Sequence, residues 1–394
     1  MTSQHIKVVI VGAGPAGLVL GNALLRNGID CAIVEQRTRA YVEQRARAGL
    51  IQHRTVEALR DLGLAERLLA AGARHTSCEF RAQDLRFTLD YATLADGATH
   101  TIYPQQNLVR DLIAAFIADG GDLRFDTPVI RLHPCREHPA VALGDGTELT
   151  CDILAGADGA HGVTRAALPA TAIGEHHRHY PYRWITVLAA APPSTTQIIY
   201  GAHRDGFAGH MLRTSTVSRY YLQCGIDDTP DDWPDDRIWE ALQHRLATSD
   251  GWTLTEGPIL DTGLLDMSTF VTTGMQAGNV YLLGDAAHVI TPAGGKGMNL
   301  AIGDAIELAR AIGARLHQGS TEHLKLYTSN RLGPIWQAQH FSDWLLHLIN
   351  TAPADDDPDF DYQLRRARLT ELAHRADLAT WFARNYAGLE VNAR

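Results

Sequence analysis

The chain of 394 residues lacks the features of a metal-cluster, disulfide-bonded or membrane protein. Its five cysteines form no Cys-x-x-Cys pair and no His/Cys metal-ligand spacing, so we expect reduced thiols and no metal. These are Cys31, Cys78, Cys135, Cys151 and Cys224. No run approaches the roughly 20 apolar residues that span a bilayer. The apolar run Ile6–Val11 passes straight into glycines, unlike a secretory leader. A cytoplasmic protein with no membrane partner is the expectation.

Positive charge is also scarce. Lysine and arginine number 35 against 45 aspartates and glutamates, a formal net charge of −10. This balance argues against nucleic acid as the main partner. What the chain has is length enough for two domains, a 45% hydrophobic content and 35 glycines.

The first glycine cluster predicts a dinucleotide site. Gly12-Ala13-Gly14-Pro15-Ala16-Gly17 follows the apolar strand Ile6–Val11 and begins an apolar-periodic helix. In such a motif the first glycine permits the turn, the second admits a pyrophosphate and the third packs helix on strand. Glu35 ends a second strand, where a carboxylate can accept from ribose hydroxyls. This pattern alone leaves NAD and FAD open.

Two later segments favour FAD. Ala155–His161, with Asp158 at its centre, follows a buried strand, and Gly284–His288 follows another at Val280–Leu283. Each alone reads as a turn. Together with the first cluster they suit one dinucleotide held along its length. Asp285 is placed to bind ribityl hydroxyls, and the helix start at 297–299 to stabilise negative charge on a reduced flavin.

The order of elements predicts an α/β fold. We expect an FAD-binding Rossmann-like domain of the glutathione-reductase type over residues 1–77, 99–179 and 266–350. Strand signals assign residues 78–98 and 180–265 to an inserted, sheet-rich substrate domain, interrupted by a helix at 235–247. Residues 351–394 are expected to form a C-terminal helical segment after the acidic loop 353–358.

Along its whole length the chain resembles the class A flavoprotein aromatic hydroxylases. The segments that carry the resemblance are Tyr41-Val42-x-x-Arg45-x-Arg47-Ala48-Gly49, Cys151-Asp152 through Asp158-Gly159-x-His161-Gly162, Ser218-Arg219-Tyr220-Tyr221, Gly284 to His288 with Pro292 and Gly297, and Asn385-Tyr386-x-Gly388-Leu389. The last of these is not shared by the wider superfamily of FAD hydroxylases.

The resemblance implies a role for each matching residue. The expected cofactor-binding residues are Gly12, Gly14, Ala16, Gly17, Glu35, Arg45, Arg47, Gln105, Asp158, His161, Arg219, Asp285, Met298 and Asn299. Among them, Arg45 and His161 match positions that meet the nicotinamide cofactor, and Arg219 an arginine that influences flavin movement. The expected substrate-binding residues are Tyr200, Met211, Arg213, Tyr221 and Pro292, and the expected catalytic residues are Tyr200 and Tyr386.

The expected reaction uses FAD, NAD(P)H and O2 to hydroxylate a para-hydroxy or para-amino benzoate beside its activating group, through a flavin C4a-hydroperoxide. That electrophile requires an electron-rich ring. Tyr200 stabilises the phenolate and Tyr386 relays its proton away. The planar fork of Arg213 suits a carboxylate.

Four residues depart from the family pattern. Met211 replaces a serine that lies two residues before the carboxylate-binding arginine, and Ser268 replaces an arginine of the nicotinamide-binding face. Gln36-Arg37 reverses the usual basic-then-polar order after Glu35. The choice between NADH and NADPH therefore stays open, as does a homodimer.

Other readings remain beside this one. An amino-substituted hydroxybenzoate such as 3-amino-4-hydroxybenzoate is the alternative substrate, and Met211 favours it. Halogenation or ring saturation on a related scaffold is a second, although the W-x-W-x-I-P signature of such halogenases does not occur. A flavin-binding or NAD-sensing module without catalysis is a third, and it leaves the pocket tyrosines and Arg213 without a purpose.

Overall fold

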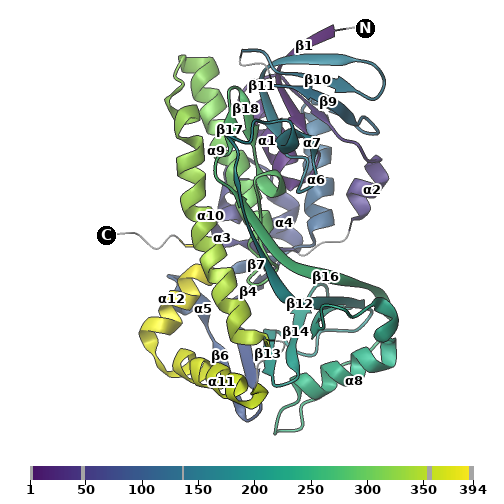
Figure 1. The fold of residues 1–394 in the computed structure, drawn as a ribbon, viewed down its shortest axis with the longest axis vertical. Coiled ribbons are helices and arrows are strands. Elements are labelled where there is room, and N and C mark those ends of the chain that lie inside the picture. Colours follow the sequence, from purple (N-terminus) through teal and green to yellow (C-terminus); the bar gives the residue numbers. More distant parts are fainter. Residues whose placement is uncertain (1–2, 46–48, 135–136, 353–356, 390–394) are drawn as a thin grey trace. The chain divides into compact units, whose positions relative to one another are not determined.

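The computed structural model describes residues 3–45, 49–134, 137–352 and 357–389 (Figure 1). The chain forms two compact units, each built from three separate segments. Unit 1 comprises residues 1–72, 103–178 and 269–339, and unit 2 comprises 73–102, 179–268 and 340–394. The predicted Arg47, and residues 353–356 of the predicted acidic loop, lie outside the described residues.

The elements of unit 1 come from all three of its segments. The strands are β1 (Ser3–Val11), β2 (Cys31–Val34), β3 (Leu50–Gln52), β8 (Asp122–Arg124), β9 (Val129–His133), β10 (Ala140–Leu143), β11 (Glu148–Gly156), β17 (Gln276–Ala277), β18 (Val280–Leu282) and β19 (His288–Val289). The helices are α1 (Pro15–Arg26), α2 (Arg39–Gln44), α3 (His53–Asp61), α4 (Glu66–Ala71), α6 (Gln105–Ala118), α7 (Val163–Ala166), η2 (Gly284–Ala286) and α9 (Gly297–Gln318).

A largely parallel sheet lies at the centre of unit 1. Its strand order is β17-β18-β11-β1-β2-β8, and β10 and β9 extend it from β11 by antiparallel pairing. Val8, Val9 and Ile10 are completely buried, as a strand covered on both faces requires. Helix α1 packs its buried residues against α6, α9 and the sheet. It ends at Arg26, with Asn27 as its C-cap.

Unit 2 is richer in antiparallel strands. Its strands are β4 (Ala73–His75), β5 (Cys78–Ala82), β6 (Leu85–Leu89), β7 (His100–Ile102), β13 (Ile198–His203), β14 (Gly206–Leu212) and β15 (Ser218–Cys224). Its helices are α5 (Tyr91–Leu94), η1 (Pro230–Asp232), α8 (Asp235–Leu246), α11 (Pro358–His374) and α12 (Ala376–Tyr386). Three long elements continue along the chain from one unit into the other: β12 (Glu175–Ala189), β16 (Ile259–Thr272) and α10 (Glu322–Ile349).

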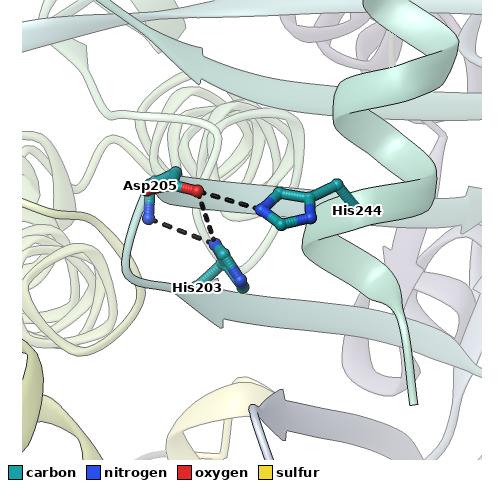
Figure 2. A group of neighbouring side chains, drawn as sticks. All are labelled: His203, Asp205 and His244. Carbon is teal, nitrogen blue, oxygen red and sulfur yellow. Dashed lines mark hydrogen bonds and ion pairs between the residues drawn. The ribbon is translucent and has the colours of Figure 1, made fainter.

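The unit 2 sheet has the strand order β16-β12-β15-β14-β13-β5-β6. One of its faces packs on α8 through Ile238, Leu242 and Leu246. Strands β13 and β14 form a hairpin, and the side chains of His203, Asp205 and His244 meet where this hairpin turns beside α8 (Figure 2).

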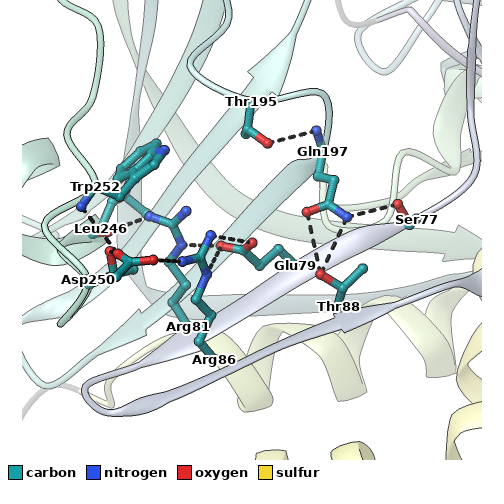
Figure 3. A network of polar contacts seen from close by, with 11 residues as sticks. Ser77, Glu79, Arg81, Arg86, Thr88, Thr195, Gln197, Leu246, Asp250 and Trp252 are labelled. Carbon is teal, nitrogen blue, oxygen red and sulfur yellow. Dashed lines mark hydrogen bonds and ion pairs between the residues drawn. The ribbon is translucent and has the colours of Figure 1, made fainter.

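A buried ion pair lies on the same strands. Arg81 and Glu79 of β5 are each almost fully buried and bonded to one another, and Arg86 of β6 joins them (Figure 3). The Arg81 guanidinium lies 3.9 Å from the centre of the Trp252 ring and donates to the carbonyl of Leu246. Phe80, between Glu79 and Arg81, points to the opposite face because side chains alternate along a strand.

The predicted α/β architecture, with a dinucleotide-type parallel sheet, a sheet-rich part and C-terminal helices, is confirmed. Helices α11 and α12 belong to unit 2. Within the described residues, no helix is both long and apolar enough to cross a membrane. The described cysteines, Cys31, Cys78, Cys151 and Cys224, are all buried and free.

Candidate active site

Four predicted motifs meet at one edge of the unit 1 sheet. Val11, the last residue of β1, is in register with Gly156 of β11 and with Val34 of β2, and Gly156 is in register with Leu282 of β18. The loops that begin at Gly12, Ala157 and Leu283, and the carboxylate of Glu35, therefore follow neighbouring parallel strands at their carboxyl ends. Ligands of open α/β sheets bind at this edge.

The three glycines of the first loop behave as their spacing predicts. Gly12 has φ of +106°, and a Cβ there would lie 2.4 Å from the carbonyl oxygen of Ala157. A Cβ at Gly17 would lie 2.0 Å from the carbonyl oxygen of Gly12. At Gly14, by contrast, no protein atom lies within 4 Å of the Cβ position. The first and third glycines thus serve packing, and the second leaves space beside the start of α1.

Backbone hydrogen bonds fix the first two acidic residues. The Glu35 carboxylate accepts from the backbone N–H of Ala13 at 2.9 Å and of Arg37 at 2.8 Å. Asp158 accepts from the backbone N–H and the hydroxyl of Thr164, and so caps the short helix α7. Burial raises the pKa of Asp158. Asp158 is therefore placed to shape its loop, and Glu35 to hold the glycine loop against β2.

Asp285 is exposed, although Gly284, Ala286 and Ala287 around it are buried. Its loop is held by Asp304 of α9, a residue that the sequence analysis did not predict. The Asp304 carboxylate accepts from the Gly284 backbone N–H at 2.9 Å. The fully buried Asp304 therefore fixes the loop on the protein side, while the next residue, Asp285, stays exposed to solvent.

Asp304 is itself neutralised by two partners. His288 Nε2 lies 2.6 Å from one carboxylate oxygen, and Arg331 Nε lies 2.6 Å from the other. Burial alone would raise the pKa of Asp304, but its interactions with His288, Arg331 and the Gly284 N–H outweigh burial and hold that pKa below its usual value. A buried carboxylate at a helical position gave no signal in the linear sequence.

Arg165 joins two of the motif loops and was also missed. Its guanidinium donates to the carbonyls of Ala160 and Ala286, at 2.6 and 2.9 Å. It also pairs with Glu175 at 2.8 Å. One arginine thereby couples the loop after β11 to the loop after β18.

The start of α9 was also predicted to contact the cofactor. The Asn299 side chain accepts from the Gln52 backbone N–H at 2.9 Å and donates to the carbonyls of Leu50 and Gly295. Its side chain is thus used within the protein, so a ligand contact of Asn299 would have to use its backbone. The cofactor contacts of Met298 and Asn299 stay a prediction. Burial lowers the pKa of Lys296, at the N-cap of α9, to about 7.

This edge suits FAD. The N-termini of α1 and α9 have no side-chain cap, so their backbone N–H groups are available to an anionic ligand. Gly14 leaves room for a phosphate to approach the backbone closely. Asp285 offers an exposed carboxylate shortly before the start of α9 in the sequence. Gln105, the first residue of α6, is half-buried, while Arg45 and His161 are exposed.

In unit 2, the predicted substrate residues gather on one face of the sheet. Tyr200 is in register with Gly209 and Gly209 with Tyr221, while Met211 is in register with Arg219. Paired residues share a face, and so do residues two apart in one strand. Tyr200, Met211, Arg219 and Tyr221 therefore project on the face opposite α8.

The two predicted catalytic tyrosines touch. The hydroxyl oxygens of Tyr200 and Tyr386 are 3.0 Å apart, although the residues are 186 positions apart in the chain. Phe80 stacks on Tyr200 at 5.3 Å between ring centres, and Phe382 stacks on Tyr386 at 5.2 Å. Burial raises the pKa of both phenols. Both are therefore neutral at physiological pH, and each hydroxyl can accept one hydrogen bond while donating another.

Arg213 directly follows β14 and is half-buried. Burial and the neighbouring charge of Arg219 lower its pKa to about 10, so it stays cationic at neutral pH. The buried Nε of Arg219 has no hydrogen-bond partner within the described residues. Two guanidinium groups thus border the face that carries Tyr200 and Tyr221.

His100 of β7 supports Tyr386 and was not predicted. Its Nε2 lies 3.0 Å from the Tyr386 carbonyl oxygen, and the two rings meet edge to face at 4.8 Å. Tyr91 packs against both rings at 5.0 Å. This aromatic cluster fixes the orientation of Tyr386, and no motif spacing could have indicated it.

The predicted residues that the structure describes are divided between the two units. Unit 1 contains Gly12, Gly14, Ala16, Gly17, Glu35, Arg45, Gln105, Asp158, His161, Asp285, Pro292, Met298 and Asn299, and unit 2 contains Tyr200, Met211, Arg213, Arg219, Tyr221 and Tyr386. Pro292, predicted to bind substrate, belongs to unit 1. Ser268, which replaces a family arginine, lies half-buried in β16.

The chain is similar to known FAD-binding proteins and aromatic hydroxylases along its length. A family model described as an FAD binding domain matches residues 5–342. The chain is 35% identical over 392 residues to p-hydroxybenzoate hydroxylase of Acinetobacter baylyi, covering 99% of this chain and 96% of that protein. It is 26% identical over 402 residues to a 3-amino-4-hydroxybenzoate 2-monooxygenase of Streptomyces platensis, covering 97% and 96%. The fold matches p-nitrophenol 4-monooxygenase of Pseudomonas putida with a TM-score of 0.81 at 18% identity, covering 98% of this chain and all of that one.

Proposed function

The chain belongs to the class A flavoprotein aromatic hydroxylases, and from that premise we propose that it hydroxylates a benzoate beside a para hydroxyl or amino group. Membership makes the protein an FAD-dependent aromatic monooxygenase. The finer proposal adds NAD(P)H as electron donor, O2 as oxygen donor and an aromatic carboxylic acid as substrate. One oxygen atom enters the ring and the other leaves as water. FAD, when bound, carries the electrons and activates the oxygen.

The observation that carries the proposal is the hydroxyl pair of Tyr200 and Tyr386. A ring is attacked more readily when its para hydroxyl loses its proton. The Tyr200 hydroxyl can take that proton at its oxygen while it passes its own to the Tyr386 oxygen, 3.0 Å away. Tyr386 must release its own hydroxyl proton towards solvent in the same transfer, because a phenol cannot hold a second proton. Burial disfavours a tyrosinate at either position, so both tyrosines are neutral before and after the transfer.

Arg213 supplies the anchor at the other end of the substrate. A cation that stays protonated at neutral pH binds a benzoate carboxylate through charge-assisted hydrogen bonds. Tyr221 lies on the same face of the sheet as Tyr200, and the aromatic rings there offer a flat surface to the substrate ring. A carboxylate at one end and a phenol at the other would fix the ring position that reacts.

The decisive experiment is Tyr200→Phe, which keeps the ring and removes the hydroxyl. We expect substrate to bind and NAD(P)H to be consumed, while the hydroxylation step slows by roughly 100-fold and hydrogen peroxide replaces product. Tyr220→Phe is the matched control, because Tyr220 is buried on the other face of β15 and its hydroxyl donates to the Thr255 carbonyl. Full coupling of NAD(P)H to product in Tyr200→Phe, like that in the control, would refute the proton relay.

A second substrate is favoured by Met211. Its side chain lies in register with Arg219, where it offers no hydroxyl donor to a carboxylate or a phenol. A 3-amino-4-hydroxybenzoate monooxygenase is among the similar proteins and is matched over 97% of this chain. An amino group donates electrons to the ring without losing a proton, so such a substrate would depend less on Tyr200. Parallel assays with 4-hydroxybenzoate and 3-amino-4-hydroxybenzoate distinguish the two.

A further inference from the structure

Two histidines and an aspartate converge at the tip of the β13–β14 hairpin, away from the residues of the proposed function (Figure 2). His203 ends β13, Asp205 lies in the turn, and His244 lies in the last turn of α8. The His244 Nε2 lies 3.0 Å from the Asp205 carboxylate oxygen, and the His203 Nδ1 lies 3.4 Å from the same oxygen. All three potential ligand atoms lie within 4.8 Å of one another.

These separations match the ligand shell of a small metal ion. Ligands about 2.0–2.1 Å from a tetrahedral Zn²⁺ are separated by about 3.3 Å from each other. The two contacts with Asp205 lie on either side of that value. Two imidazoles and one carboxylate are also a frequent protein donor set for zinc with an open fourth position.

The hydrogen bonds of His203 leave an unfavourable contact that a cation would relieve. The Asp205 backbone N–H donates to the His203 Nδ1 at 3.2 Å, so that nitrogen carries no proton. The Asp205 carboxylate oxygen, a second acceptor, lies 3.4 Å from this nitrogen with no proton between the two atoms. A cation between them would accept both lone pairs, at the expense of the long amide hydrogen bond.

Two arginines next to the site, Arg204 and Arg245, have partners outside it. Arg204 pairs with Asp359 at 3.0 Å, and Arg245 donates to the Gln223 carbonyl at 2.7 Å. Both guanidinium groups are thus engaged in other contacts. The side chains of Asp205 and His244 are 54% and 61% exposed, so an ion can enter from solvent and retain a water ligand.

We propose that His203, Asp205 and His244 bind a divalent transition-metal ion of the zinc type, which fastens the β13–β14 hairpin to helix α8. The same hairpin carries Tyr200, three residues before His203. The ion joins the turn to a helix that packs under the sheet, so its expected effect is on hairpin stability. The sequence alone did not indicate this group, because His244 lies 39 positions from Asp205.

The test measures zinc binding by the full FAD-loaded chain. After equilibrium dialysis against micromolar ZnSO4 with excess Mg²⁺, we expect the wild type to retain one zinc per chain more than either ligand variant. His244→Ala and Asp205→Asn should each weaken that binding at least about tenfold. Both side chains are largely exposed, so these variants are expected to fold.

His347→Ala is the matched control. The His347 side chain is 60% exposed and lies 3.6 Å from the Asp343 carboxylate, but it does not belong to the group of His203, Asp205 and His244. It should retain the same zinc as the wild type. X-ray absorption of the loaded protein should show nitrogen and oxygen ligands at about 2.0 Å. Equal zinc retention by the wild type and both ligand variants would overturn the assignment, as would zinc lost from the control alone.

Discussion

The two units hold their predicted ligand-binding residues by different means. In unit 1 the main chain does most of the positioning: backbone N–H groups orient Glu35 and Asp158, and two glycines are required because a Cβ would strike a carbonyl oxygen. In unit 2 the positions depend on ring packing, as the stacking of Phe80 on Tyr200 and Phe382 on Tyr386 shows. Backbone geometry restricts the residue type at positions a fixed distance apart, so it is visible in the sequence as a motif. Ring packing uses residues from distant segments, so it leaves no such motif.

This difference can be tested first at the buried anchor of unit 1. Asp304→Ala removes the shared partner of Gly284, His288 and Arg331, and leaves a guanidinium group without its counter-charge. We expect a loss of about 3–5 kcal/mol in the free energy of unfolding, measured by urea denaturation at pH 7. The exposed pair of Arg39 and Glu43 offers a control, and Glu43→Ala should cost about 1 kcal/mol or less.

The pH dependence adds a second readout to the same variant. A carboxyl whose pKa is lowered in the folded state stabilises the protein above its ordinary pKa, and this stabilisation is lost as the pH falls through the folded value. The gap between wild type and Asp304→Ala should therefore narrow as the pH falls below about 3.8. A constant gap at all pH values would mean that Asp304 acts through packing and not through charge.

The glycine loop provides the next test, with two substitutions of equal size. Gly17→Ala places a Cβ 2.0 Å from the Gly12 carbonyl oxygen, so the protein should lose about 1–3 kcal/mol of stability or fail to fold. Gly14→Ala meets no protein atom within 4 Å, so thermal unfolding without FAD should be unchanged while FAD binding weakens. Calorimetry of the apoprotein and flavin fluorescence titration measure the two effects. If both variants unfold at the same lowered temperature, Gly14 is structural as well.

Arg213→Ala tests whether unit 2 relies on a single charged side chain. The loss of a charge-assisted contact of about 1.5–3 kcal/mol should raise the KM for the aromatic acid about ten- to a hundredfold. Arg183→Ala is a suitable control, because Arg183 is a partly exposed arginine of β12 that pairs with Asp266. An unchanged KM in Arg213→Ala with a normal rate would remove Arg213 from the carboxylate site.

Met211→Ser is expected to have the smallest effect. A hydroxyl beside Arg213 adds one hydrogen-bond donor, for which about 0.5–1.5 kcal/mol is usual, so the KM for 4-hydroxybenzoate should fall about two- to tenfold. The KM for 3-amino-4-hydroxybenzoate should stay the same or rise. Steady-state NAD(P)H oxidation with each acid decides it, and equal changes for both acids would show that Met211 does not select between them.

Much of unit 1 could be predicted because its signals are local. The strand Ile6–Val11 was expected within a few residues of its observed bounds, a helix was expected after the glycines, and the start of α9 was expected at 297–299. The glycine loop and Glu35, predicted to bind the cofactor, both follow strands at the carboxyl edge of the parallel sheet. Helix α9 was predicted, but not the buried Asp304 within it, because a carboxylate at a helical position normally faces solvent.

The residues of unit 2 were accessible mainly through family resemblance. Nothing in the spacing of Tyr200 and Tyr386 indicates that their hydroxyls touch, since 186 positions separate them. His100 gave no signal for a similar reason: it lies in a three-residue strand far from the helix that it supports. The division into 78–98, 180–265 and a separate 351–394 remains a prediction beside the observed segments of unit 2.

The interleaving of the two units also bears on how the protein is made. A ribosome delivers the chain from residue 1 onward, yet β5 must wait for its partner β13, and Tyr200 for Tyr386, which is synthesised 186 residues later. The last segment of unit 2, from residue 340, emerges after every segment of unit 1. Unit 2 therefore cannot complete its core until the segment from residue 340 has been translated, whereas domains with continuous sequences fold from their N-termini. We expect nascent chains of this protein to depend on chaperones, and fragments that end between residues 102 and 340 to aggregate, because they expose an incomplete unit 2 sheet.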